Sequence, residues 1–271
     1  MYRLLVCFHT TPNPDLLSED EWIAGSRTGA VDTDYLKKEL SAYDESALEL
    51  SCRFADACGA DVPCQLCAVT IADGGGDRFL QMLAAVGFAQ TDRIAIPDET
   101  ARVSLSSEQT AGLLYSYIKQ QGPFDLILCG RCSSDGSMGK VPLLLAEALG
   151  MRCITQVTNV TPADGSGIKV IHDTDTGVRE TVWHEAAVLV IGNAADTYLR
   201  VPTLRARMQH KGQRIGLYDP AVLMPQAPAA DAVLRSMEPV LQKRNAVRVD
   251  TADPAEAARI MRSYFETWMN E

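Results

Sequence analysis

The sequence lacks any apolar run long enough to cross a membrane and any long run of basic residues. A transmembrane helix needs about 20 consecutive apolar residues, and no such stretch occurs in the 271 residues. The formal net charge is −10 at pH 7, which argues against binding to a nucleic-acid backbone. The first residues, MYRLLVCF, enter a strand-like run rather than a signal peptide. We therefore expect a cytoplasmic protein with no membrane span and no nucleic-acid partner.

The motifs of common catalytic sites are also missing. There is no HExxH zinc motif, no carboxylate pair at metal-ligand spacing and no GxSxG nucleophile elbow. The four histidines are scattered along the chain. Neither a GxxxxGK[ST] phosphate loop nor a GxGxxG dinucleotide fingerprint is present. The sequence accordingly offers no catalytic residue and no metal ligand set.

Eight cysteines include two Cys-x-x-Cys pairs, Cys64–Cys67 and Cys129–Cys132. Cysteines of a cytosolic chain are usually free thiols rather than a disulfide framework. Residues three apart on a strand face opposite ways, and roughly 60 residues separate the pairs, too far for a zinc ribbon. We favour ordinary core and loop cysteines, with a redox or cluster role as the alternative.

The first two-thirds of the chain alternate strand and helix signals. Short apolar runs bounded by turn residues predict strands, and apolar positions at helical spacing, with Ser106 and Gln109 as a capping box, predict helices. The strands are expected at residues 3–8, 63–71, 93–96 and 125–129, and the helices at residues 44–57, 77–86 and 106–118. Repeated βα units predict an α/β fold with a doubly wound, mainly parallel sheet. Ligands of such sheets bind at the carboxyl ends of the strands.

The pattern changes after Gly150. Residues 153–160, 168–172 and 178–183 alternate polar and apolar side chains, which predicts an antiparallel meander. Residues 187–191 predict one more buried strand. A Pro/Ala-rich arm follows Gly216, and a terminal helix begins at Asp253 and Pro254. We expect an α/β domain over residues 1–215, and over residues 216–271 an arm and helix that embrace a partner subunit.

A phosphate cradle is predicted within residues 125–150. A strand leads into a loop of small residues, and an amphipathic helix follows from Val141, with Leu143, Leu145 and Leu149 on its apolar face. Such a junction presents free backbone N–H groups and a favourable helix dipole to an anion. Asp135 is a candidate for a ribose contact or a turn former. Lys140 is a candidate for neutralising a phosphate or an ordinary surface lysine.

Four stretches together resemble the beta subunit of electron transfer flavoproteins over nearly the whole chain. The most specific is DLILCGRCSSDGSMGKVPLLLAEALG, which matches the long signature of that family without a gap. The other three occur in the right order and spacing: LLVCFHTTPNPD, SAYDESALEL and TLRARMQHKGQRI. The resemblance implies an adenine nucleotide alpha hydrolase-like sheet that binds FAD or AMP.

By position, the resemblance implies that Cys7 offers its backbone to the adenine and that Ile71 lies beside the adenosine pocket. Cys132 through Val141 would wrap the ribose and phosphate. The implied nucleotide site consists of Cys7, His9, Ser41, Ala42, Tyr43, Asp44, Ile71, Gly130, Cys132, Ser133, Ser134, Asp135, Gly136, Ser137, Met138, Gly139, Lys140 and Val141. Leu204 matches the exposed apolar residue through which family members engage dehydrogenases.

Several positions depart from the family pattern. Ser41-Ala42 stands in place of Asn-Pro, Ser137-Met138 in place of Asp-Thr, and Pro142 in place of Gly. The choice between FAD and AMP therefore stays open. Leu204-Arg205 resembles the Ile-Arg pair of the electron-bifurcating type, which favours FAD.

The resemblance implies a heterodimer with an alpha subunit, in which this chain is part of an electron carrier rather than an enzyme by itself. Electrons would come from an acyl-CoA dehydrogenase, another flavin dehydrogenase or NADH, and electron-bifurcating NADH oxidation is an open activity of the complex. The main alternative is an adenine-nucleotide-binding module without a redox role. An adenylate-transferring or hydrolysing enzyme is a weaker alternative, because the sequence has no metal-binding carboxylate cluster.

Overall fold

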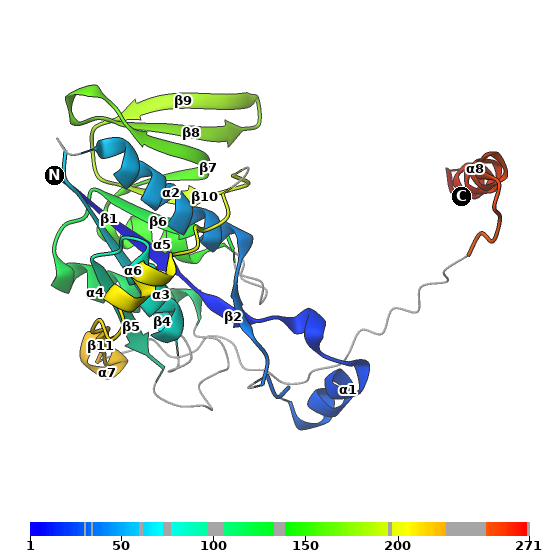
Figure 1. Ribbon diagram of the computed structural model, residues 1–271, viewed down its shortest axis with the longest axis horizontal. Helices are drawn as coiled ribbons and strands as arrows, with labels where there is room; N and C mark the ends of the chain where they lie inside the picture. The colour runs from blue at the N-terminus through cyan, green and yellow to red at the C-terminus, as the bar shows by residue number, and fades with distance from the viewer. Residues whose placement is uncertain are drawn as a thin grey trace.

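A twisted β-sheet lies between two layers of helices (Figure 1). The structure, a computed structural model, describes residues 1–29, 31–33, 35–59, 62–72, 77–96, 106–132, 139–194, 197–225 and 248–269. Within these residues, nine strands form one sheet in the order β11-β5-β4-β1-β6-β10-β7-β8-β9. Their bounds are β1 Tyr2–Phe8, β4 Cys64–Ala72, β5 Gln90–Ala95, β6 Leu126–Gly130, β7 Arg152–Pro162, β8 Ile168–Thr174, β9 Gly177–Trp183, β10 Ala187–Ile191 and β11 Gly216–Tyr218.

Every pairing from β11 to β7 is parallel, and β7, β8 and β9 pair antiparallel. The central strands are continuous apolar runs because both of their faces are covered. On β1, Leu4 and Val6 point to one face of the sheet, and Leu5 and Cys7 point to the other. The predicted α/β class, with a mainly parallel doubly wound sheet and an antiparallel meander, is confirmed.

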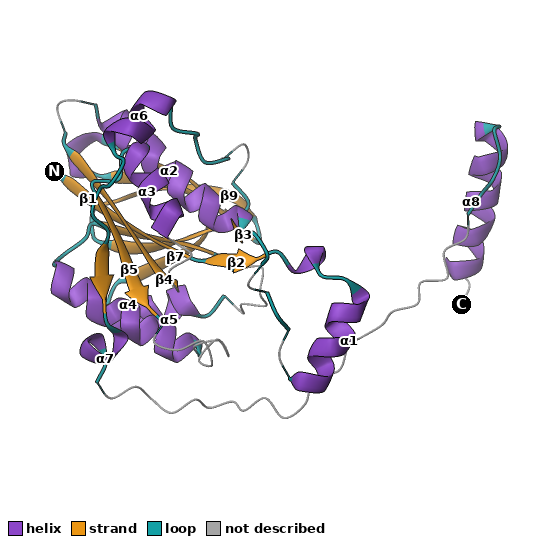
Figure 2. Cartoon of the chain, turned by 60° about the horizontal axis from the view of Figure 1, so that its bottom comes forward, coloured by secondary structure: helices purple, strands orange, loops and turns teal. Residues whose placement is uncertain are grey.

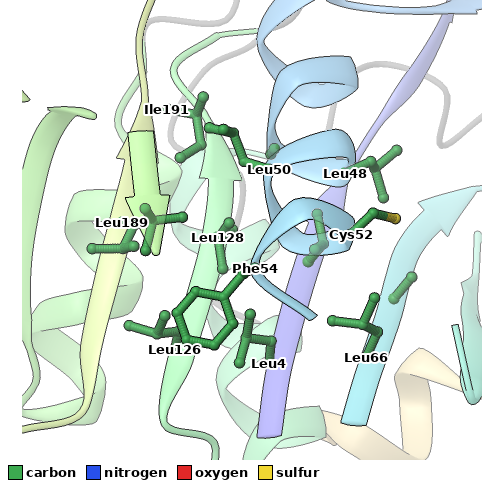
Figure 3. Close-up of a cluster of buried hydrophobic side chains, with 14 of the residues drawn as sticks. Leu4, Leu48, Leu50, Cys52, Phe54, Leu66, Leu126, Leu128, Leu189 and Ile191 are labelled. Carbon is green, nitrogen blue, oxygen red and sulfur yellow. The ribbon is translucent and has the colours of Figure 1, made fainter. Parts of the chain in front are cut away.

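One hydrophobic cluster fills the space between the sheet and helices α2 (Ala42–Cys58) and α3 (Asp77–Ala85). Figure 3 shows Leu48, Cys52 and Phe54 of α2 directed at strand residues such as Leu4 and Leu128. The opposite face of the sheet carries a second cluster. That cluster is covered by α4 (Ser107–Gln121), α5 (Val141–Leu149) and α7 (Pro220–Leu223).

Three features differ from the expectations. A two-stranded excursion, β2 (Thr10–Pro12) with β3 (Lys38–Leu40), projects from the end of β1 and carries helix α1 (Glu19–Thr28), none of which was predicted (Figure 2). Strand β11 extends the sheet at Gly216–Tyr218, where the regular pattern was expected to fade. Leu143 of α5 is 49% exposed rather than buried, because Pro142, Leu145 and Ala146 form the covered face.

The capping signals were predictive. Ser106 and Gln109 form the expected capping box at the start of α4. The terminal helix α8 is Pro254–Met269, and the Asp253 carboxylate accepts a hydrogen bond from the Ala255 N–H at 3.0 Å. None of the helices within the described residues has the length and apolar character that a membrane crossing requires. The division at residue 215 stays a prediction.

Candidate functional site

The candidate nucleotide site lies where the carboxyl ends of β1, β4 and β6 meet the amino termini of α2 and α5. Parallel pairing brings the strand ends together, since Cys7 is opposite Cys129 and Phe8 is opposite Thr70. In an α/β sheet this edge is where ligands bind. Residues that are far apart in the sequence, from His9 to Gly139, are thereby gathered at one edge.

The start of α2 is organised by Ser41 and Asp44. Ser41 is the N-cap residue, and its Oγ accepts a hydrogen bond from the Asp44 backbone N–H at 3.0 Å. The same hydroxyl donates to Asp44 Oδ2 at 3.0 Å. Ser41 therefore still caps this helix, although it replaces the Asn of the family pattern. Ala42 is exposed, and Tyr43 is partly exposed at the same turn.

The Asp44 carboxylate joins three segments of the site. Its Oδ2 accepts the His9 backbone N–H at 3.4 Å, and its Oδ1 accepts the Gly130 N–H at 3.2 Å. These bonds tie the amino end of α2 to the ends of β1 and β6. The side chain is 5% exposed, and burial raises the pKa of its carboxyl to about 6 against the lowering effect of the Ser41, His9 and Gly130 hydrogen bonds.

Gly130 has no room for a side chain. A Cβ at this position would lie 2.8 Å from the backbone nitrogen of Asp44 and would overlap its Oδ1. A glycine is therefore required for the close approach of α2 to the end of β6. The next residue continues the pairing of β6 with β10, because the Arg131 N–H donates to the Ile191 carbonyl at 3.1 Å.

Cys7, Cys129 and Ile71 form the buried wall beneath this edge on the α4 and α5 side of the sheet. The hydrogen bond with Cys7, together with burial, raises the pKa of Cys129 well above its usual value. A neutral thiol here is an ordinary apolar packing group. The side chains of these residues thus pack in the hydrophobic core. The contact predicted between Cys7 and the adenine would therefore be made by the Cys7 backbone.

Only the two ends of the predicted phosphate cradle belong to the described residues. Ser133, Ser134, Asp135, Gly136, Ser137 and Met138 lie outside them. Gly139 has φ 68°, and a Cβ there would be 2.9 Å from the Arg131 carbonyl oxygen. The far end of the cradle is thereby packed against its beginning, near Cys132. Lys140, exposed, precedes Val141, and Pro142 occupies an early helical position of α5.

Two threonines that the sequence reasoning missed lie at the same strand ends. Thr10 follows β1 and Thr70 lies near the end of β4, with 7% and 1% exposure. Neither hydroxyl has a hydrogen-bond partner within the described residues. A buried hydroxyl without a partner is costly, so these groups fit a ligand that carries hydrogen-bonding atoms, as an adenine nucleotide does. For Thr70 the signal in the sequence was a polar residue late in an otherwise apolar strand, whereas Thr10 begins the short strand β2 and carried no such signal.

The cysteines of the Cys64–Cys67 pair are divided between the two faces of the sheet. Cys64 packs with the α2-side cluster and Cys67 lies in the opposite cluster, as the strand geometry predicts. Burial raises the pKa of Cys64 to about 12 and also raises that of Cys67. Across the described ranges, no three His, Cys, Asp or Glu side chains are grouped as metal ligands.

A second candidate surface surrounds helix α6 (Leu204–Gln209). We call Tyr198, Val201, Leu204 and Met208 the α6 surface; their exposures are 80%, 77%, 74% and 69%. Five Lys or Arg residues and no Asp or Glu occur from Arg200 to Arg214. An open groove of about 670 Å³ lies beside this surface, between α6 and the end of α3. Leu204 is therefore one of several exposed apolar residues in a segment that is also rich in basic residues.

Comparison with known proteins gives a consistent result. The family described as electron transfer flavoprotein domain matches residues 28–208. The protein named "Putative electron transfer flavoprotein subunit YgcR" of Escherichia coli (strain K12) is 30% identical over 207 residues, which cover 76% of this chain and 77% of that protein. The electron transfer flavoprotein subunit beta of Bacillus subtilis (strain 168) is 28% identical over 236 residues, covering 86% and 87%.

Proposed function

The chain belongs to the electron transfer flavoprotein family, and from this premise we propose that it is the beta subunit of a cytoplasmic heterodimer that holds FAD or AMP. The heterodimer passes electrons from a flavin dehydrogenase, such as an acyl-CoA dehydrogenase, or from NADH to a downstream acceptor. The observation that carries the proposal is the joining of β1, α2 and β6 by the Asp44 carboxylate at the ligand-binding edge of the sheet.

The residues at this edge suit an adenine nucleotide. The Cys7 backbone and the Thr10 and Thr70 hydroxyls supply hydrogen-bonding groups for the adenosine. Ser41 and Tyr43, at the amino end of α2, would border the bound adenosine. A bound FAD would supply the redox chemistry, while the protein supplies position and electrostatics.

The phosphate groups belong at α5 rather than at α2. A helix amino terminus attracts an anion, but the first turn of α2 already contains the Asp44 carboxylate. A phosphate placed there would meet a like charge. The start of α5 has no acidic residue in its first turn, and the exposed Lys140 precedes it. These charges support a phosphate at the start of α5 rather than at the start of α2.

The alpha subunit is the proposed partner of the terminal arm and α8. Apolar side chains recur at helical spacing along one face of α8, and they are exposed by more than half in this chain. They are Met261, Tyr264, Phe265 and Met269. An amphipathic helix with an uncovered apolar face is suited to a groove on a partner.

The flavin dehydrogenase is the proposed partner of the α6 surface. Apolar side chains in the centre and basic residues at the rim match the general anatomy of a protein interface. The whole chain carries a charge of −10, so this basic segment is locally distinct from the rest. A complementary partner would present an apolar pocket with an acidic rim, and the association rate would fall as salt increases.

The decisive experiment is to co-express the chain with an alpha-subunit homologue, denature the purified complex and quantify every released nucleotide. Two FAD per heterodimer support a flavin at this site and favour bifurcation or NADH chemistry. One FAD with one AMP makes the chain a structural nucleotide holder in a simple carrier. Failure to form a complex at micromolar concentration refutes the proposal, and adenine nucleotide without flavin would favour a binding module without a redox role.

A further inference from the structure

Helix α2 supports both proposed sites. Its first turn holds the ends of β1 and β6 through Asp44. Its first two turns also hold residues 197–200, a segment that includes Tyr198 of the α6 surface. The two sites therefore share one helix. Side chains of α2 make more hydrogen bonds to residues 197–200 than to the ends of β1 and β6.

The contacts along α2 anchor the backbone of the segment. Glu45 Oε1 accepts the Leu199 N–H at 3.1 Å, and Glu49 Oε2 accepts the Arg200 N–H at 3.1 Å. The hydroxyls of Ser46 and Thr197 hydrogen-bond to each other. Side chains spaced along one helix face thus replace the regular backbone hydrogen bonds that a loop lacks.

Arg200 adds a two-pronged ion pair to this anchor. Its Nε lies 3.1 Å from Glu49 Oε2, and its Nη2 lies 3.0 Å from Glu49 Oε1. A third guanidinium nitrogen, Nη1, contacts Asp56 Oδ2 at 2.7 Å. The Glu49 side chain is only 6% exposed, whereas that of Asp56 is 63% exposed. The buried, bidentate bond to Glu49 is therefore the geometrically demanding one, and a lysine cannot reproduce it.

Apolar side chains of residues 198–202 are alternately exposed and buried. Leu199 and Pro202 are buried, whereas Tyr198 and Val201 point outward. Without an anchor, exposed apolar residues on a loop would sample many arrangements, and a partner would have to order them on binding. The anchor thus presents the α6 surface in one arrangement before any partner arrives.

We propose that Arg200 and Glu49 are positioning residues of the α6 surface, and that their ion pair sets the affinity of this surface for its protein partner. The inference rests on the proposed function insofar as the partner is a flavin dehydrogenase. Neither residue belongs to the candidate nucleotide site. It acts by holding residues 197–200 against α2.

Arg53 offers a matched control. It is on α2 and also contacts Glu49, with its Nε 3.1 Å from Oε1, and this ion pair joins two residues of the same helix. Arg200→Lys and Arg53→Lys therefore make the same chemical change to two partners of one carboxylate. Only the first should loosen the docking segment. The double variant Glu49→Gln with Arg200→Gln avoids a buried unpaired carboxylate, and it tests the proposal should the single variant fail to fold.

The test uses the full heterodimer and three measurements: hydrogen exchange of a peptide spanning residues 197–203, nucleotide content, and the dissociation constant for a purified acyl-CoA dehydrogenase. Arg200→Lys and the double variant should raise exchange at the Leu199 and Arg200 amides and weaken docking, each by about tenfold. Nucleotide content should not change. Arg53→Lys should stay within about twofold of the wild type.

Unchanged exchange in Arg200→Lys would overturn the inference, as would equal effects of Arg200→Lys and Arg53→Lys. Faster exchange with unchanged docking would also overturn it. If the wild-type complex binds no dehydrogenase, the proposed partner is wrong, and the exchange measurement alone then decides whether the pair orders the segment. Failure of the inference and failure of the proposed function are thus distinguishable.

Discussion

Asp44 should make the stability of this protein fall as pH rises from 4 to 7. Its pKa is raised from an ordinary 3.8 to about 6, chiefly by burial. The folded chain therefore binds a proton at this carboxyl more tightly than the unfolded chain. Between these two pKa values the native state carries more protons, so the free energy of unfolding decreases as pH increases through the window.

The magnitude follows from the difference between the two pKa values. About 2 pKa units at 1.36 kcal/mol each amount to about 3 kcal/mol in total. The full amount separates pH values below 3.8 from those above 6. Between pH 4 and pH 7 the contribution of Asp44 should thus change by about 2 to 3 kcal/mol. Hydrogen bonds from Ser41, His9 and Gly130 stabilise the ionised Asp44 carboxylate in the folded chain, so they limit the rise in its pKa.

Asp44→Asn removes this titration and keeps the shape of the side chain. Urea unfolding of the full chain should be followed for both proteins at several pH values from 4 to 7. The amide loses one acceptor oxygen, which shifts the stability of the variant equally at every pH. The quantity to compare is wild-type stability minus variant stability, because other titrating groups cancel in it. That difference should fall by about 2 to 3 kcal/mol as pH rises; a difference that is flat or rising would refute the reasoning.

Three further predictions concern other parts of the two sites. Gly130→Ala should destabilise the chain by about 1 to 3 kcal/mol and lower its nucleotide content, because the new Cβ collides with Asp44; denaturation and nucleotide analysis would contradict this by finding wild-type values. Leu204→Ala should reduce the rate of electron transfer from a flavin dehydrogenase about tenfold or more while changing the free energy of unfolding by less than about 0.5 kcal/mol, since this residue is 74% exposed. A lower free energy of unfolding with an unchanged rate of electron transfer would argue against docking at Leu204. Glu49→Gln should show the opposite pH dependence to Asp44→Asn. Burial raises the pKa of Glu49, but the hydrogen bonds and charge of Arg200 together with the hydrogen bond from Arg53 outweigh burial and lower this pKa below 4.5. The contribution of Glu49 is therefore present above that value and is lost on acidification. Equal pH slopes for Glu49→Gln and the wild type in urea unfolding would contradict the sign.

The order of strands and helices was accessible from the sequence because each element carries its own local signal. The buried strand at Ala187–Ile191 is a continuous apolar run, and the start of α4 carries a capping box whose partners are three residues apart. The strands β2, β3 and β11 were missed because each has only three residues. Such short strands exist only where a neighbouring strand supplies their hydrogen bonds.

The residue types of the candidate site were also accessible, but their connections were not. The resemblance pointed to Ser41, Asp44 and Gly130 as separate contributors to a nucleotide pocket. The fold joins them, because the Asp44 carboxylate bonds to Gly130 86 residues away. No local pattern indicates such a bond, since it depends on how closely α2 approaches the end of β6. The hydroxyls of Thr10 and Thr70, which have no partner within the described residues, likewise point to a ligand only once their burial is known.

The sequence by itself determined the parallel α/β architecture and the edge of the sheet at which a ligand is expected, because hydrophobic periodicity and capping chemistry are local properties of a chain. The tertiary structure alone decided that Asp44 is buried with a raised pKa and that Arg200 is paired with Glu49, 151 residues away. Desolvation and bidentate pairing both depend on what surrounds a side chain in space, and that neighbourhood is assembled from segments that are distant in the sequence.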